Sequence, residues 1–146
     1  MPDLVKEIMI DATPETVFPF LVEADKHIEW DGTEAELDAR PGGIYRVLVA
    51  GTYQSAGEFV EVVPNERVVY TFGWDQAGNP ITPGSSRVEI TLQAEGSKTR
   101  LKLVHSGLPD DAVADHTSGW DNYVGRLAIV AAGGTVGPDV PVDQPA

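Results

Sequence analysis

One stretch of the chain, Asp115 to Gly134, constrains the fold more than any other. Its large apolar residues recur at spacings of three and four, which places them on one helical face: Trp120, Tyr123, Val124, Leu127, Val130 and Ala131. Gly133 and Gly134 are expected to end the helix, because glycine accepts the left-handed conformation that a helix end needs. A helix with a single apolar stripe must be covered on that side. The rest of the chain is therefore predicted to supply the cover.

The preceding residues predict a strand, a helix and then a run of antiparallel strands. A strand is expected at 4–10, and a helix from Pro14 to about Ala24, with Thr13 as its N-cap. Pro19 lies inside this helix and predicts a bend or a break into two short pieces. Further strands are expected at 33–38, 44–50, 53–63, 67–74, 85–94 and 99–106.

The last three predicted strands alternate between apolar and polar residues, which is typical of a sheet with one covered and one solvated face. The apolar phase of one of them contains Leu101, Leu103 and His105. We therefore predict an α+β fold. A curved antiparallel sheet of about six or seven strands would wrap around the long C-terminal helix, with a shorter helix or helix pair after the first strand.

Composition excludes several classes of function. The net charge of −13 would repel nucleic acid and anionic membranes, so neither is an expected partner. No apolar run approaches the ~20 residues that a membrane span requires, and the N-terminus lacks a signal-peptide pattern. The absence of cysteine rules out disulfides and thiolate metal sites and is consistent with a cytoplasmic location.

Two histidines are candidates for chemistry. His105 is expected to point inward, where it could bind a ligand carboxylate or act as an acid or base. The alternative for His105 is a buried ring whose hydrogen bonds are satisfied by the start of the last helix. His116 lies one turn before Trp120 and could reach the same cavity. The three histidines of the chain lack the spacing of a metal site, so no metal and no cofactor is expected.

The aromatic residues could line a pocket for an apolar or ring-shaped molecule, although ordinary core packing explains any one of them as well. With neighbouring residues of the last helix they form the predicted ligand cavity: Trp30, Tyr45, Phe59, Tyr70, Phe72, Trp74, His105, His116, Trp120, Tyr123, Val124 and Leu127.

A set of short motifs in a fixed order resembles the SRPBCC superfamily (START-like, pollen-allergen-like). The closest branch is the one named after the C-terminal domain of the activator of the Hsp90 ATPase. The motifs are IDATPETVF at 10–18, RPGG at 40–43, GEFVEVVP at 57–64, RVVYTF at 67–72, TRLKL at 99–103, HSGLP at 105–109, and Gly119-Trp120 with Leu127. The resemblance implies a helix-grip fold over residues 1–134, with a cavity between sheet and helix. Residues 135–146 are expected to be a disordered, proline-rich acidic tail.

Three functions follow from this resemblance. The first is a single-domain START-like protein that binds a small apolar or aromatic ligand without catalysis. The second is a cyclase- or dehydratase-like enzyme that works without a metal and uses His105 for proton transfer. The third is a co-chaperone-like module that binds a chaperone or another protein through its acidic exterior. The chain could act as a monomer or as a homodimer.

Overall fold

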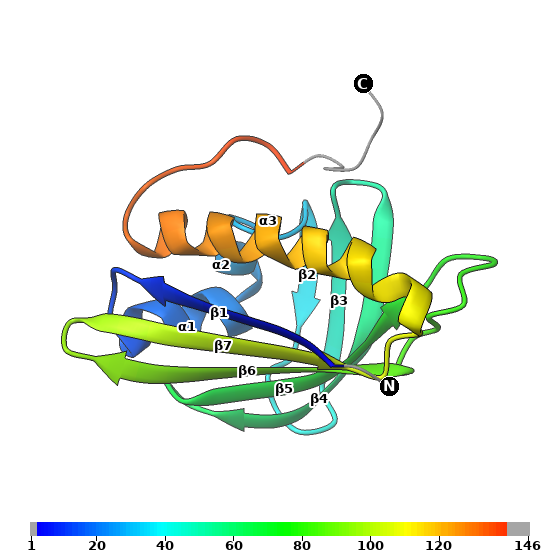
Figure 1. The fold of residues 1–146 in the computed structure, drawn as a ribbon, viewed down its shortest axis with the longest axis horizontal. Helices are drawn as coiled ribbons and strands as arrows, with labels where there is room; N and C mark the ends of the chain where they lie inside the picture. Colours follow the sequence, from blue (N-terminus) through cyan, green and yellow to red (C-terminus); the bar gives the residue numbers. More distant parts are fainter. Residues whose placement is uncertain (1–2, 140–146) are drawn as a thin grey trace.

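The computed structural model describes residues 3–139 and shows one seven-stranded antiparallel sheet crossed by a long helix (Figure 1). The elements are β1 (Leu4–Ile10), α1 (Pro14–Val22), α2 (Ala24–His27), β2 (Glu34–Leu37), β3 (Ile44–Val49), β4 (Tyr53–Val63), β5 (Arg67–Trp74), β6 (Ser86–Glu95), β7 (Lys98–Ser106), a 3₁₀ turn η1 (Asp110–Ala112) and α3 (Val113–Ala131). The strand order is β1-β7-β6-β5-β4-β3-β2, so β1 and β2 form the two edges. The predicted α+β helix-grip architecture is confirmed.

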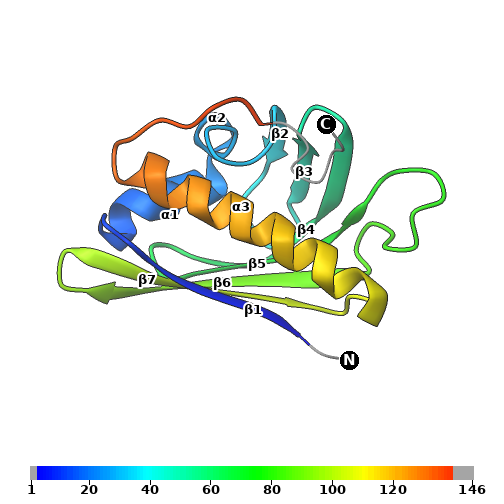
Figure 2. The same cartoon turned by 45° about the horizontal axis from the view of Figure 1, so that its top comes forward.

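The sheet curves around α3, which lies diagonally across its concave face (Figure 2). The pairing of β4 with β5 shifts register between Phe59 and Glu61, as at a β-bulge. Nearby, Gly57 approaches β5 so closely that a Cβ atom there would overlap the carbonyl group of Thr71. A glycine and a bulge are the usual means by which a strand bends, and here they turn β2, β3 and the start of β4 toward the helix.

The predicted helix after β1 is divided in two, but the division does not fall at Pro19. α1 continues through Pro19 to Val22, and Glu23 then takes an extended conformation before α2 begins. The backbone N–H of Glu23 donates to the carbonyl oxygen of Pro19, which closes the last turn of α1. Pro19 is tolerated because α1 is short and only one intrahelical hydrogen bond is lost.

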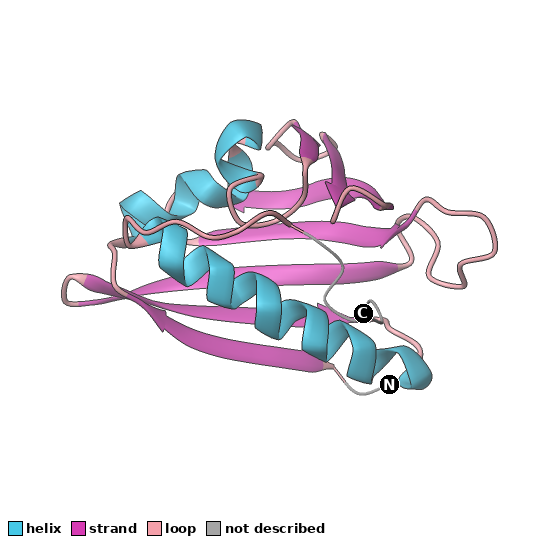
Figure 3. Cartoon of the chain, turned by 90° about the horizontal axis from the view of Figure 1, so that it is seen from above, coloured by secondary structure: helices cyan, strands magenta, loops and turns pink. Residues whose placement is uncertain are grey.

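The core lies between α3 and the concave face of the sheet, which α3 crosses in the view from above (Figure 3). Every residue of the predicted stripe on α3 is buried, from Trp120 to Ala131, and so are the inward residues of β6 and β7. At the centre of the sheet Tyr45 and Tyr70 stack with their ring centroids 4.1 Å apart. No helix within residues 3–139 is long and apolar enough to cross a membrane.

The chain beyond α3 contacts the rest of the domain over its last described residues. Residues 135–139 turn back over α2 and the connector that follows it (Figures 1 and 2). The side chain of Asp139 is buried, and Val136 packs against the core. The carboxylate of Asp139 accepts hydrogen bonds from the backbone of Gly32 and Ala50. Disorder of residues 135–146 stays a prediction from composition. Residues 140–146 of the expected tail lie outside the described residues.

Replacing Gly57 by alanine tests the origin of the curvature. The added Cβ would overlap backbone rather than a movable side chain, so Gly57→Ala is expected to lower the free energy of unfolding by about 2 kcal/mol or more. The control is Gly125→Ala on the exposed side of α3, where nothing lies within 4 Å and alanine should stabilise the helix by up to ~1 kcal/mol. Urea denaturation measures the free energy of unfolding of both variants. A Gly57→Ala protein as stable as the Gly125→Ala protein would contradict the role of Gly57.

Candidate functional site

A cavity of about 440 Å³ lies between the first half of α3 and the ends of β3, β4 and β5. Its sheet side is formed mainly by Phe72 and Trp74 of β5 and by Tyr53 at the start of β4. Trp120 and Tyr123 close it from the helix. We call this space the aromatic cavity. Its volume falls within the range of ~300–1,000 Å³ that is usual for small-molecule sites.

The structure divides the twelve predicted cavity residues into two groups. Five of them line the aromatic cavity: Phe72, Trp74, His116, Trp120 and Tyr123. The other seven lie inside the closed core and do not reach the cavity wall: Trp30, Tyr45, Phe59, Tyr70, His105, Val124 and Leu127. The remaining wall residues lie outside these twelve: Asp31, Val49, Ala50, Tyr53, Asn79, Asp115, Ser118 and Gly119. Gly119 could have been found from its helical spacing to His116 and Tyr123, whereas Asp31 and Asn79 lie in loops whose position the sequence does not indicate.

Two tryptophan–histidine hydrogen bonds fix the wall of the aromatic cavity. The indole N–H of Trp120 donates to Nδ1 of His105 over 3.0 Å, which joins α3 to β7. The indole N–H of Trp74 donates to Nε2 of His116 over 3.1 Å, which joins β5 to α3. The two imidazole rings meet edge to face, with centroids 5.7 Å apart. The four residues therefore form one connected polar frame across the sheet–helix boundary.

The hydrogen bonds of His105 define its protonation state. Because Nδ1 accepts from Trp120, the ring proton must lie on Nε2, which is 2.9 Å from Oγ of Ser86. That hydroxyl then donates to the carbonyl oxygen of Phe72 over 2.8 Å. Burial, and secondarily the nearby His116, lower the pKa of His105 to about 3. Both ring nitrogens are used within the protein, by Ser86 of β6 and by Trp120 in the middle of α3 rather than by the start of that helix.

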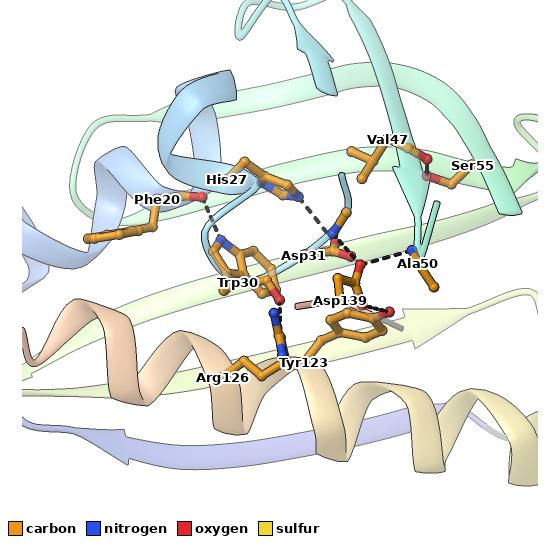
Figure 4. Close-up of polar contacts among 11 residues, drawn as sticks. Phe20, His27, Trp30, Asp31, Val47, Ala50, Ser55, Tyr123, Arg126 and Asp139 are labelled. Carbon is orange, nitrogen blue, oxygen red and sulfur yellow. Dashed lines mark hydrogen bonds and ion pairs between the residues drawn. The ribbon is translucent and has the colours of Figure 1, made fainter. Parts of the chain in front are cut away.

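A second polar cluster lies beside the aromatic cavity and includes the end of the described chain (Figure 4). Asp31 and His27 are both buried and are joined by a contact of 3.2 Å between Oδ2 and Nε2. The carboxylate of Asp139 accepts hydrogen bonds from the backbone of Gly32 and Ala50 and from the hydroxyl of Tyr123. Figure 4 shows these side chains converging between α3 and the β3–β4 turn.

The C-terminal segment also forms one side of a groove of about 470 Å³. The opposite sides come from the connector at 28–33 and from Arg126 and Val130 near the end of α3. The guanidinium of Arg126 donates to the carbonyl oxygens of Trp30 and Gly137, each at 2.9 Å. The indole of Trp30 in turn donates to the carbonyl oxygen of Phe20, so Trp30 ties α1 to α3 and does not face a cavity. Within residues 3–139 no group of side chains is arranged to hold a metal ion.

The buried state of His105 predicts a pH-dependent stability. Its folded pKa of about 3 lies below the ordinary 6.5, so the unfolded chain binds the proton more readily. The contribution of the neutral ring is complete above pH 6.5 and is lost as the pH falls toward 3, by about 1.4 kcal/mol per pH unit. His105→Gln should be less stable at neutral pH but should lose stability less steeply on acidification. Urea denaturation of both proteins over this pH range measures the difference, and parallel curves would contradict the buried, neutral ring.

Comparison with known proteins gives a consistent family assignment. The family model described as activator of Hsp90 ATPase homolog 1-like protein matches residues 11–132. An AHSA1-like protein from Rhizobium etli, solved by NMR, is 44% identical over 99% of this chain and 90% of its own, with a TM-score of 0.75. The comparison with curated proteins found no match.

More distant structures share the fold alone. The Aha1 dimer from Colwellia psychrerythraea is 18% identical, with a TM-score of 0.78 over 92% of this chain and 98% of the other. DynU16, from the dynemicin biosynthetic locus, is 21% identical with a TM-score of 0.78 over 91% of this chain, which spans only 48% of that protein. The match to the family model and the Rhizobium relative together show that the chain belongs to the family of activator of Hsp90 ATPase homolog 1-like proteins.

Proposed function

We propose that the protein binds a small hydrophobic molecule in the aromatic cavity. The supporting observation is the cavity itself, a space of about 440 Å³ that the side chains leave open between α3 and the sheet. Trp120, Tyr123 and Phe72 in its wall are buried, and Trp74 is half-buried. A ligand that covers these surfaces removes apolar area from water, which is the main driving force for binding of this kind.

The hydrogen bonds around the cavity favour an apolar ligand. Both indole N–H groups in the wall are already paired with histidine nitrogens, so the rings of Trp74 and Trp120 present their faces and carbon edges. A flat or ring-shaped molecule can pack on such surfaces in stacked or edge-to-face geometry. The polar groups of Asn79 and Asp115 lie in the wall contributed by the 75–85 loop and the first turn of α3.

The same hydrogen bonds weigh against the enzymatic alternative that relies on His105. A general acid or base must reach the proton that it transfers, and its pKa is best matched to the working pH. His105 is fully buried, both its nitrogens are engaged, and its pKa is lowered to about 3. Binding without proton transfer by this residue is therefore the function that the geometry supports best. A chaperone partner stays a prediction from the resemblance.

Gly119 allows the cavity to be blocked without disturbing the core. It lines the cavity, and a Cβ atom at this position would meet nothing within 4 Å. Gly119→Leu is therefore expected to place its side chain in the cavity and to weaken the binding of Nile red, a neutral hydrophobic dye, by roughly tenfold or more. Fluorescence titration measures the affinity. Native mass spectrometry of the purified wild type should show a bound small molecule that the variant lacks.

Gly125→Leu is the matched control. Gly125 also lies in α3 with nothing within 4 Å, but it is exposed and outside the cavity. Both variants replace a helical glycine and should gain up to ~1 kcal/mol of stability, so a difference in dye binding cannot come from stability. Equal dye affinity in the two variants, or no binding by the wild type, would contradict the proposed function.

A further inference from the structure

The carboxylate of Asp139 is held in a well-formed anion site built by other parts of the chain. Its Oδ2 accepts the backbone N–H of Gly32 over 2.7 Å and that of Ala50 over 2.9 Å. Its Oδ1 accepts the hydroxyl of Tyr123 over 2.6 Å. The three donors come from the connector after α2, the β3–β4 turn and α3, and we call them the carboxylate cradle (Figure 4).

The backbone of the cradle is held in an uncommon conformation. Gly32 and Ala50 both have positive φ angles, of 90° and 55°. A positive φ is unfavourable for alanine because of its Cβ atom, and such strain is found preferentially at ligand clamps. Burial is the main cause that raises the pKa of the Tyr123 hydroxyl, so this group remains a proton donor. Hydrogen bonds from these donors to a carboxylate are charge-assisted and stronger than neutral ones.

The cradle joins the aromatic cavity to the groove. Ala50 and Tyr123 line the aromatic cavity, while Gly32 and Asp139 line the groove on the other side. A molecule whose carboxylate replaced that of Asp139 could therefore extend its body from Tyr123 into the aromatic cavity. The exchange replaces one carboxylate in the cradle by another. The nearby Asp31 therefore repels the carboxylate of the ligand no more than it repels that of Asp139.

Within residues 132–139, the segment that carries Asp139 is held by few other contacts. Most of its residues are exposed, Val136 is only partly buried, and Arg126 binds it through the carbonyl oxygen of Gly137. Among residues 132–139, which follow α3, Asp139 is the one whose side chain is buried. Displacing it would expose little apolar surface, and an incoming carboxylate would restore the three hydrogen bonds that Asp139 gives up.

We infer that the carboxylate cradle binds the acid group of an apolar carboxylic acid whose body lies in the aromatic cavity, and that Asp139 occupies the cradle as an intramolecular competitor. The inference rests on the proposed function and adds the chemical class of its ligand. Only those molecules in which Asp139 has left the cradle can bind the acid. The apparent affinity for the acid is therefore the intrinsic affinity multiplied by the fraction of such molecules. A neutral analogue of the same shape does not compete with Asp139.

Calorimetric titration tests this inference with a matched pair of compounds, the acid phenylbutanoate and the neutral phenylbutanamide. Both compounds are titrated into the wild type and into Asp139→Ala. The variant is expected to bind the acid roughly tenfold more tightly than the wild type, with an unchanged affinity for the amide. Adding Tyr123→Phe to Asp139→Ala removes one cradle donor and should reverse most of the gain for the acid alone. The amide resonances of Gly32 and Ala50 should shift when the acid is added to Asp139→Ala.

Glu66→Ala is the control for charge, because Glu66 is an exposed acid in the β4–β5 turn and lines neither the aromatic cavity nor the groove. It should leave the affinity for both compounds unchanged. If Asp139→Ala folds poorly, the isosteric Asp139→Asn should show a smaller gain in the same direction. Binding of both compounds with no gain for the acid in either variant overturns the cradle and leaves the proposed function standing. No binding of either compound to any variant overturns both.

Discussion

The hydrogen bond from the indole of Trp120 to His105 is the interaction on which the site depends. It joins the middle of α3 to β7, and it fixes the proton of His105 on the nitrogen that faces Ser86. The apolar stripe of α3 explains why the helix lies on the sheet, but a stripe alone permits rotation and sliding. A buried indole N–H without a partner would cost about 1–3 kcal/mol, so this bond specifies one position of the helix.

That position divides α3 into two halves with different roles. Towards its C-terminal end, Leu127, Val130 and Ala131 pack into a closed core. Towards its N-terminal end, the rings of Trp74 and Trp120 are each fixed by a histidine partner, and the space between sheet and helix stays open. The frame that stabilises the fold thereby also keeps the cavity from collapsing, and the C-terminal segment forms one side of the groove next to it.

The fold could be predicted from the sequence because its signals are periodic. The spacing of Trp120, Tyr123 and Leu127 identified the face of α3, and the alternation in the last strands identified the covered side of the sheet. The site could be predicted only in part, because periodicity shows that a side chain points inward but not what it meets there. Tyr45 and Phe72 both point inward, yet Tyr45 stacks on Tyr70 while Phe72 borders open space. The place of Asp139 depends on three backbone and side-chain donors that meet only in the folded chain, so composition alone could not indicate it.

A structure of the protein with Nile red bound tests the central claim most directly. The dye is expected between the rings of Trp74 and Trp120, in contact with Tyr123, with both tryptophan–histidine hydrogen bonds intact. Dye bound elsewhere, or a first half of α3 that has collapsed onto the sheet and filled the space with side chains, would contradict a ligand cavity held open by this frame.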